Sequence, residues 1–135
     1  MQLTTFFTLA ASVSLALAGC FTGGETWGND IYNANNLMYN VVCKGLGNSV
    51  YNAGETKSWC YHLTDEKRVD FSIRNFQNKR DTLSYDNCIL LLREIAGCEH
   101  GGRRAYTKFE FTSDPNRGRC AVRGPLPDNW PWPGA

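Results

Sequence analysis

Apolar residues recur three or four positions apart in two stretches of the chain, and this spacing is typical of one face of a helix. In the first stretch they are Ile31, Ala34, Leu37, Met38, Val41 and Val42, and in the second Tyr85, Cys88, Leu91, Leu92 and Ile95. Asp30 and Ser84 precede the two stretches as candidate N-caps, and Gly45 and Gly97 follow them. The pattern therefore predicts two amphipathic helices.

Other stretches alternate apolar and polar residues, which is the pattern of a strand with one buried and one solvated face. The clearest of them sets Val69, Phe71 and Ile73 against Arg68, Asp70, Ser72 and Arg74. We also expect a hairpin in which residues 49–51 pair with 57–63 around a turn at 52–55. A long strand is predicted over 105–112, and Asp114-Pro115-Asn116 after it is typical of a turn, because proline fixes the second turn position.

The predicted order is one helix, three strands, a second helix and a last strand. Amphipathic helices must bury their apolar faces, and short antiparallel strands with one apolar face must do the same. A small antiparallel sheet with two helices packed on it satisfies both needs. The predicted fold class is therefore α+β.

Six cysteines are spread along the chain: Cys20, Cys43, Cys60, Cys88, Cys98 and Cys120. They form no C-x-x-C pair, so the tight spacing of zinc sites is absent, and we expect no metal and no cofactor. An even set of well-spaced cysteines in a short exported chain predicts three disulfides instead. Their spacing leaves the pairing open. Among the alternatives we favour Cys98 with Cys120, which would tie the second helix to the segment after the last strand.

The first 18 residues have the pattern of a signal peptide. An apolar run from Phe6 ends in Ala16-Leu17-Ala18, whose small residues suit cleavage after Ala18. The run is shorter than the roughly 20 apolar residues of a membrane span, so we expect no membrane insertion. Residues 17–20 also fit a bacterial lipid-attachment box, but the leader lacks the basic start that bacterial leaders carry. We therefore predict a secreted, extracellular protein.

Three parts follow from this organisation: a signal peptide (1–18), a single cysteine-rich α+β domain (19–124) and a C-terminal tail (125–135) rich in proline and tryptophan. The prolines exclude a helix or a central strand in the tail, so we expect it to lie extended over the surface. The chain carries 14 basic and 13 acidic side chains, a balance without the basic face that binds nucleic acid.

Aromatic residues make up 13% of the chain and include four tryptophans, which suits the binding of a sugar. A tryptophan ring offers a flat apolar platform, and amide and carboxylate side chains bond sugar hydroxyls. Two clusters combine these types and are the candidate glycan contacts: Trp27, Asn29 and Asp30, and then Asp128, Asn129, Trp130 and Trp132. Core packing of Trp27, and a tail folded back onto the domain, are the competing interpretations.

Catalytic residues are not assigned, and we expect that the protein is not an enzyme. His62, Glu110 and Arg74 could act as base, acid and phosphate clamp of a secreted ribonuclease, but a surface histidine on a strand is the favoured interpretation. The G-x-S-x-G turn of many serine hydrolases is absent from the sequence.

After the leader the chain opens with CFTGGETWGN, and later it carries Asp86-Asn87-Cys88, Leu92, Ile95, Cys98, Gly101-Gly102, Asp114-Pro115-Asn116, Gly118 and Cys120. This framework resembles a large group of small cysteine-rich proteins secreted by fungi, near a mushroom glycan-binding cytotoxic protein. Similarity to fungal killer-toxin-like and necrosis-inducing effector domains is looser.

The resemblance implies a lectin-like, non-catalytic protein that binds an extracellular glycan or glycoprotein, with cytotoxic or defence activity. A killer-toxin or effector-like protein acting on a protein target is the alternative, and a secreted hydrolase comes third.

Overall fold

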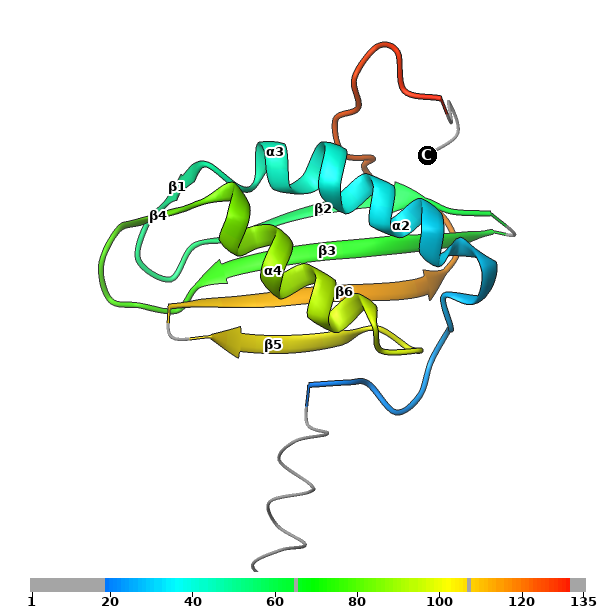
Figure 1. Cartoon of the computed structure of the whole chain (residues 1–135), viewed down its shortest axis with the longest axis horizontal. Coiled ribbons are helices and arrows are strands. Elements are labelled where there is room, and N and C mark those ends of the chain that lie inside the picture. Colours follow the sequence, from blue (N-terminus) through cyan, green and yellow to red (C-terminus); the bar gives the residue numbers. More distant parts are fainter. Residues whose placement is uncertain (1–18, 65, 107, 132–135) are drawn as a thin grey trace, which may run out of the picture.

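The computed structural model describes residues 19–64, 66–106 and 108–131. The predicted signal peptide and Trp132 lie outside these residues. Two helical segments pack on one face of a four-stranded sheet, and a small two-stranded sheet lies at one end of the molecule (Figure 1). The predicted α+β class is confirmed.

Both predicted helices are present. The first segment runs without a break through four short elements: η1 (Gly28–Asp30), α2 (Ile31–Leu37), the π-helical η2 (Met38–Val42) and α3 (Cys43–Gly45). Its apolar stripe is buried, with Leu37, Met38 and Val42 fully inaccessible. The second helix, α4 (Tyr85–Ala96), begins at Ser84, whose Oγ accepts a hydrogen bond from the backbone N–H of Asn87 at 3.2 Å.

The main sheet is antiparallel throughout and has the order β2 (Thr56–His62), β3 (Lys67–Asn75), β6 (Phe109–Arg117), β5 (Gly102–Tyr106). One face of β3 and β6 buries Val69, Phe71, Ile73 and Phe111 against the helices. Because side chains alternate along a strand, the polar residues between them lie on the opposite face. The described helices leave that face uncovered (Figure 1).

The predicted hairpin between residues 49–51 and 57–63 is wrong. Instead, β1 (Ser49–Tyr51) pairs with β4 (Asp81–Leu83), and β2 pairs with β3. The buried Asn75 explains this arrangement, because its Nδ2 donates to the carbonyl oxygens of Asn52 at 3.1 Å and Lys79 at 2.8 Å. One amide thus joins the segment after β1 to the segment before β4, and local sequence spacing does not reveal such a link.

The single strand predicted over 105–112 is also wrong, because a hairpin divides it. β5 ends at Tyr106 and β6 begins at Phe109, and these two residues are cross-strand partners. The predicted turn at Asp114-Pro115-Asn116 lies inside β6, where Pro115 pairs with Val69. Pairing with β5 extends only to Ser113, the partner of Gly102 at the beginning of β5. Pro115 therefore lies beyond that strand, and its missing N–H costs no bond to it.

Three disulfides are present, as predicted, and they join Cys20 to Cys98, Cys43 to Cys88 and Cys60 to Cys120. The favoured pairing of Cys98 with Cys120 is wrong. Cys98 follows α4 and lies next to the N-terminal segment, in which Cys20 forms a backbone β-bridge with Gly102. Cys120 follows β6, and its disulfide partner Cys60 lies in β2.

Candidate functional site

The face of the main sheet turned away from the helices is polar, and we call it the open face. Its side chains come from all four strands: Ser58, Cys60 and His62 of β2; Arg68, Asp70, Ser72 and Arg74 of β3; Arg103 of β5; and Glu110, Thr112, Asp114 and Asn116 of β6. Most are partly exposed. Rigid strands therefore present a set of hydrogen-bonding groups in fixed positions.

Asp70 and Asp114 lie opposite each other on β3 and β6, at the centre of the open face. Asn116 joins them, because its Nδ2 donates to Asp70 Oδ2 at 2.8 Å and to Asp114 Oδ2 at 3.1 Å. Arg68 Nε also donates to Asp70 Oδ2, at 3.0 Å. We call Arg68, Asp70, Asp114 and Asn116 the carboxylate network. Its members hold one another in place before any ligand arrives.

The two carboxylates of the network differ in their electrostatics. Burial raises the pKa of Asp114 above its usual value, and the negative charge of Asp70 acts in the same direction. The hydrogen bond from Asn116 and the charges of Arg68 and Arg103 oppose this effect without cancelling it. Asp114 thus takes up a proton more readily than an ordinary aspartate does.

A shallow groove of about 530 Å³ lies over the β2–β3 half of the open face, beside the network. Ser58, Arg68, Asp70 and Ser72 contribute to its floor, and residues 119–122 form a wall. In this wall Arg119 is exposed and Val122 has 81% of its surface exposed. The groove therefore combines donors and acceptors with the apolar side chains of Ala121 and Val122.

Covalent and hydrogen bonds hold that wall against the sheet. Cys120 is bonded to Cys60 of β2, and the backbone N–H of Cys120 donates to His62 Nε2 at 3.0 Å. Further along the chain, the backbone N–H of Gly124 donates to the carbonyl oxygen of Cys60 at 2.8 Å. The wall belongs to the rigid part of the site.

Trp27 and Asp30, two of the predicted glycan contacts, are buried, each with 3% of its surface exposed. The indole Nε1 of Trp27 donates to the carbonyl oxygen of Cys98 at 2.8 Å, so this ring is part of the core and presents no free face to a sugar. Asn29 between them is exposed. Of the first predicted cluster, only Asn29 is therefore exposed to solvent.

Asp30 serves the fold. Its Oδ2 lies 2.9 Å from Lys67 Nζ, and its Oδ1 accepts hydrogen bonds from the hydroxyl and the backbone N–H of Thr64. Burial alone would raise its pKa, but the bonds from Thr64 and Lys67 outweigh that effect and lower it. The predicted N-cap bond from its side chain to the helix is absent.

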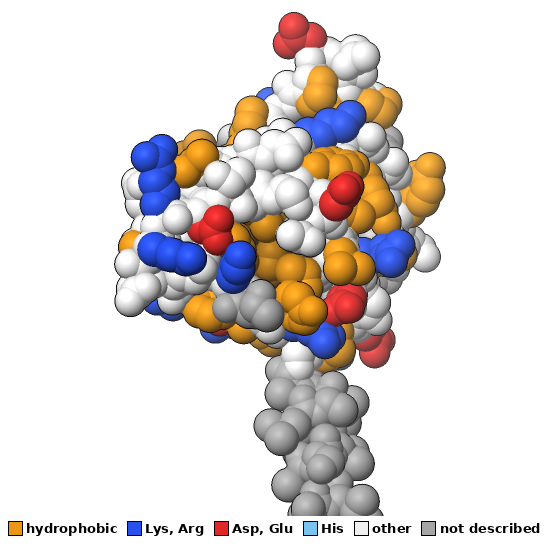
Figure 2. All heavy atoms as spheres, turned by 60° about the vertical axis from the view of Figure 1, so that its left-hand side comes forward, with side chains coloured by type: hydrophobic (Ala, Val, Ile, Leu, Met, Phe, Trp, Pro, Cys, Tyr) orange, Lys and Arg blue, Asp and Glu red, His pale blue; other side chains and the backbone are white. Residues whose placement is uncertain are grey.

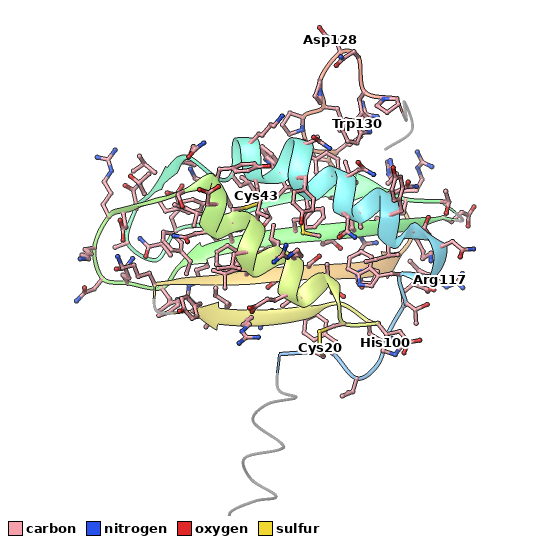
Figure 3. All side chains as sticks on the ribbon, viewed as in Figure 1. Cys20, Cys43, His100, Arg117, Asp128 and Trp130 are labelled. Atoms are coloured by element: carbon pink, nitrogen blue, oxygen red, sulfur yellow. A yellow bond between two sulfur atoms is a disulfide. The ribbon has the colours of Figure 1, made fainter. Side chains whose placement is uncertain are left out.

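The described members of the second predicted cluster, Asp128, Asn129 and Trp130, lie on the loop after Cys120. Figure 3 shows Asp128 at the tip of this loop and Trp130 nearer the body of the molecule. Asp128 and Asn129 are exposed, whereas Trp130 is partly buried and packs against the core. The packing of Trp130 agrees with a tail that folds back onto the domain. Residues of this loop also line an open hollow of about 500 Å³.

The carboxylate network was not among the predicted contacts. Alternation along 68–74 had already marked Arg68 and Asp70 as residues of a solvated face. The proline-containing tripeptide Asp114-Pro115-Asn116 is typical of a turn, so the pattern alone does not place Asp114 and Asn116 on this face. Reading that tripeptide as the end of a strand, with proline where no partner strand needs its N–H, would have placed both on the same face.

His62, Glu110 and Arg74 do not come together as a ribonuclease site would require. His62 is level with Arg68 in the sheet, whereas Glu110 is level with Arg74, six residues further along β3. At about 3.3 Å per residue these positions lie roughly 20 Å apart.

In residues 19–64, 66–106 and 108–131, no group of three or more His, Cys, Asp or Glu side chains could hold a metal ion. None of the helices in those ranges has the length and apolar character needed to cross a bilayer.

The structure is thus a small disulfide-linked α+β domain with one polar sheet face that the described helices leave uncovered. A family model described as "Glycan binding domain Y3" matches residues 36–120, which is more than half of the chain. The chain therefore belongs to this family of glycan-binding domains, and membership supports a glycan-binding, lectin-like function. A comparison with curated proteins finds no match. Similarity to killer-toxin-like and necrosis-inducing domains stays a prediction.

Proposed function

We propose that the protein is a secreted, non-catalytic lectin that binds an extracellular glycan on the open face of its sheet. The observation that carries this proposal is the carboxylate network, in which Asp70, Asp114, Asn116 and Arg68 are fixed by mutual hydrogen bonds of 2.8–3.1 Å. The family match covers all four residues.

The chemistry of the network suits sugar hydroxyls. A hydroxyl both donates and accepts, so it can bond a carboxylate and an amide or guanidinium at the same time. Because neighbouring side chains already hold Asp70 and Asn116, little side-chain entropy is lost when a ligand binds. Val122 in the groove wall can pack against an apolar C–H face of the ring.

Secretion and biological role are parts of the same proposal. Three disulfides persist in an oxidising compartment, and the leader predicts export into one. Binding to glycoproteins on another cell would account for cytotoxic or defence activity without any catalytic step.

A glycan array tests this function, with the oxidised wild-type protein beside Asp70→Ala and Asn116→Ala. We expect the wild type to bind a subset of glycans and both variants to lose about tenfold or more in affinity, since each removes a charged or charge-assisted contact. Glu99→Gln is the matched control, because Glu99 is exposed and lies outside the open face. It should bind as the wild type does.

The predicted tail contacts need their own variant, Asp128→Ala combined with Asn129→Ala. Unchanged binding in this variant supports the open face as the site. If this double variant loses binding while Asp70→Ala still binds, the glycan site lies on the tail and not on the open face. No binding by the wild type to any glycan would refute the lectin proposal.

A further inference from the structure

A second hollow lies on the helix side of the sheet, between α4, β4 and the β5–β6 hairpin. We call it the α4 groove, and its lining residues are Asp81, Thr82, Leu83, Asn87, Leu90, Leu91, Tyr106, Lys108 and Phe109. Figure 2 shows apolar side chains gathered at this end of the molecule, with acidic and basic side chains around them. Its volume is about 180 Å³.

Large apolar side chains in the α4 groove are unusually exposed. Tyr106 of β5 has 57% of its surface exposed and Leu90 of α4 has 46%, while Leu83 and Phe109 beneath them are buried. Tyr106 is the cross-strand partner of Phe109, so it projects on the helix side of the sheet and not on the open face. An aromatic ring thus stands at the side of an apolar floor.

The rim of the α4 groove is polar and electrically balanced. Asp81 is held in place because its Oδ1 accepts from the N–H of Thr82 at 2.8 Å and its Oδ2 from Gln77 Nε2 at 3.1 Å. Lys108 Nζ lies 3.7 Å from the same Oδ2. The amide of Asn87 completes the rim. The two charges offset each other, which favours an uncharged ligand that carries hydrogen-bonding groups.

The size and lining narrow the class of ligand. A volume of about 180 Å³ is below the ~300–1,000 Å³ of sites for drug-sized ligands, so a single ring fits and an oligosaccharide does not. An apolar floor with an aromatic side and a polar rim matches a pyranose, which has a C–H face and hydroxyls at its edge. A second copy of the chain that paired with the free edge of β5 would face the exposed charges of Arg103 and Arg104. These charges disfavour a dimer formed at this edge.

We propose that the α4 groove is a second carbohydrate site, which takes one neutral terminal sugar residue stacked on Tyr106. The choice of a sugar rests on the proposed lectin function, whereas the groove and its rim stand on their own residues. Because the open face lies on the other side of the sheet, the two sites can be occupied together. A single chain can then bind one glycan on the open face and a second in the α4 groove, and so link two glycans without forming a dimer.

Two-dimensional NMR of the oxidised protein tests the second site with methyl glycosides of galactose, mannose, fucose and N-acetylglucosamine. At least one glycoside should shift the amide signals of Asn87, Leu90 and Tyr106. Tyr106→Ala should weaken that response about tenfold, and Tyr106→Phe, which keeps the ring, should restore it. Tyr32→Ala is the matched control, because Tyr32 is also exposed and lies on α2, away from the groove.

Asp70→Ala separates this proposal from the open-face proposal. The response of the α4 groove should persist in Asp70→Ala, and its loss there would reduce the two sites to one. Absence of any shift in the wild type, while a glycan still binds the open face, would overturn the second site alone. Shifts of the same amides with protein concentration and no sugar would assign the groove to a second copy and also overturn it.

Discussion

At the scale of single residues, two aspartates show how burial and partners decide the role of a carboxylate. Asp30 is enclosed and paired with Lys67, and its pKa is lowered, so its charge stabilises the folded chain. Asp114 faces Asp70 on the open face, and its pKa is raised. A carboxylate whose charge is not fully compensated is available to a ligand, and that difference separates the structural Asp30 from Asp114, which we propose as a binding residue.

Asp114→Asn should stabilise the protein at neutral pH. A raised pKa means that the folded state binds this proton more tightly, so the contribution of Asp114 to stability is present at low pH and is lost as the pH rises through the raised pKa. Removing the charge should raise the free energy of unfolding at pH 7 by less than about 1 kcal/mol. Urea unfolding at pH 7 and at pH 3 measures it, and the gain should vanish at pH 3. A variant less stable than the wild type at pH 7 would contradict the assignment.

Residue types alone did not reveal which predicted contacts are accessible. Trp27 and Asp30 have the chemistry of a sugar site, yet long-range contacts with Cys98 and Lys67 bury them. Arg68 and Asp70 are accessible because they fall on the solvated side of an alternating strand. Strand alternation was therefore a better guide to the open face than the clustering of aromatic and amide residues.

At the scale of elements, periodicity predicted both helices and their ends, because an apolar stripe and a following glycine are local signals. Strand partners were not predictable in this way. β1 pairs with β4 across 30 residues of chain. The hairpin between β5 and β6 puts Tyr106 and Phe109, three positions apart, on the same face, whereas the strict alternation predicted over 105–112 would put them on opposite faces. Partner choice depends on non-local contacts such as those of Asn75.

Gly45 at the end of α3 permits close packing of the first helical segment on β2. A Cβ at this position would lie 2.1 Å from Cη2 of Trp59. Gly45→Ala should therefore lower the free energy of unfolding by about 1–3 kcal/mol through overpacking, although alanine favours helices. Urea unfolding followed by tryptophan fluorescence measures the loss. Gly23→Ala is the control, since nothing lies within 4 Å of its added Cβ; equal stability of both variants would contradict this packing.

At the scale of the whole molecule, the described helices cover one side of the sheet (Figure 1), and the strand register places polar side chains on the other. Each disulfide ties a different pair of parts: the N-terminal segment to the end of α4, the first helical segment to α4, and β2 to the groove wall. The open face is thus held by strands and by the disulfide between Cys60 and Cys120 at its border. Such a frame favours recognition without a large change of shape.

The three disulfides should open in an order set by burial. Cys43 and Cys88 are fully inaccessible, whereas Cys20 is exposed and Cys60 and Cys120 are partly exposed. Under a mild reductant we expect Cys43–Cys88 to be reduced last, because attack on a disulfide requires access to a sulfur. Alkylation of the released thiols and mass spectrometry of the peptides measure the order. Early loss of Cys43–Cys88 would contradict the described core.

The central claim is that a glycan binds on the open face, and mapping the contact by NMR tests it most directly. The oxidised protein is titrated with the glycan that binds most strongly on the array, and the shifted amide signals are assigned. Our account predicts that the largest shifts cluster on residues 68–72 of β3 and 112–116 of β6. Shifts confined to residues 123–131, with the signals of β3 and β6 unchanged, would contradict it.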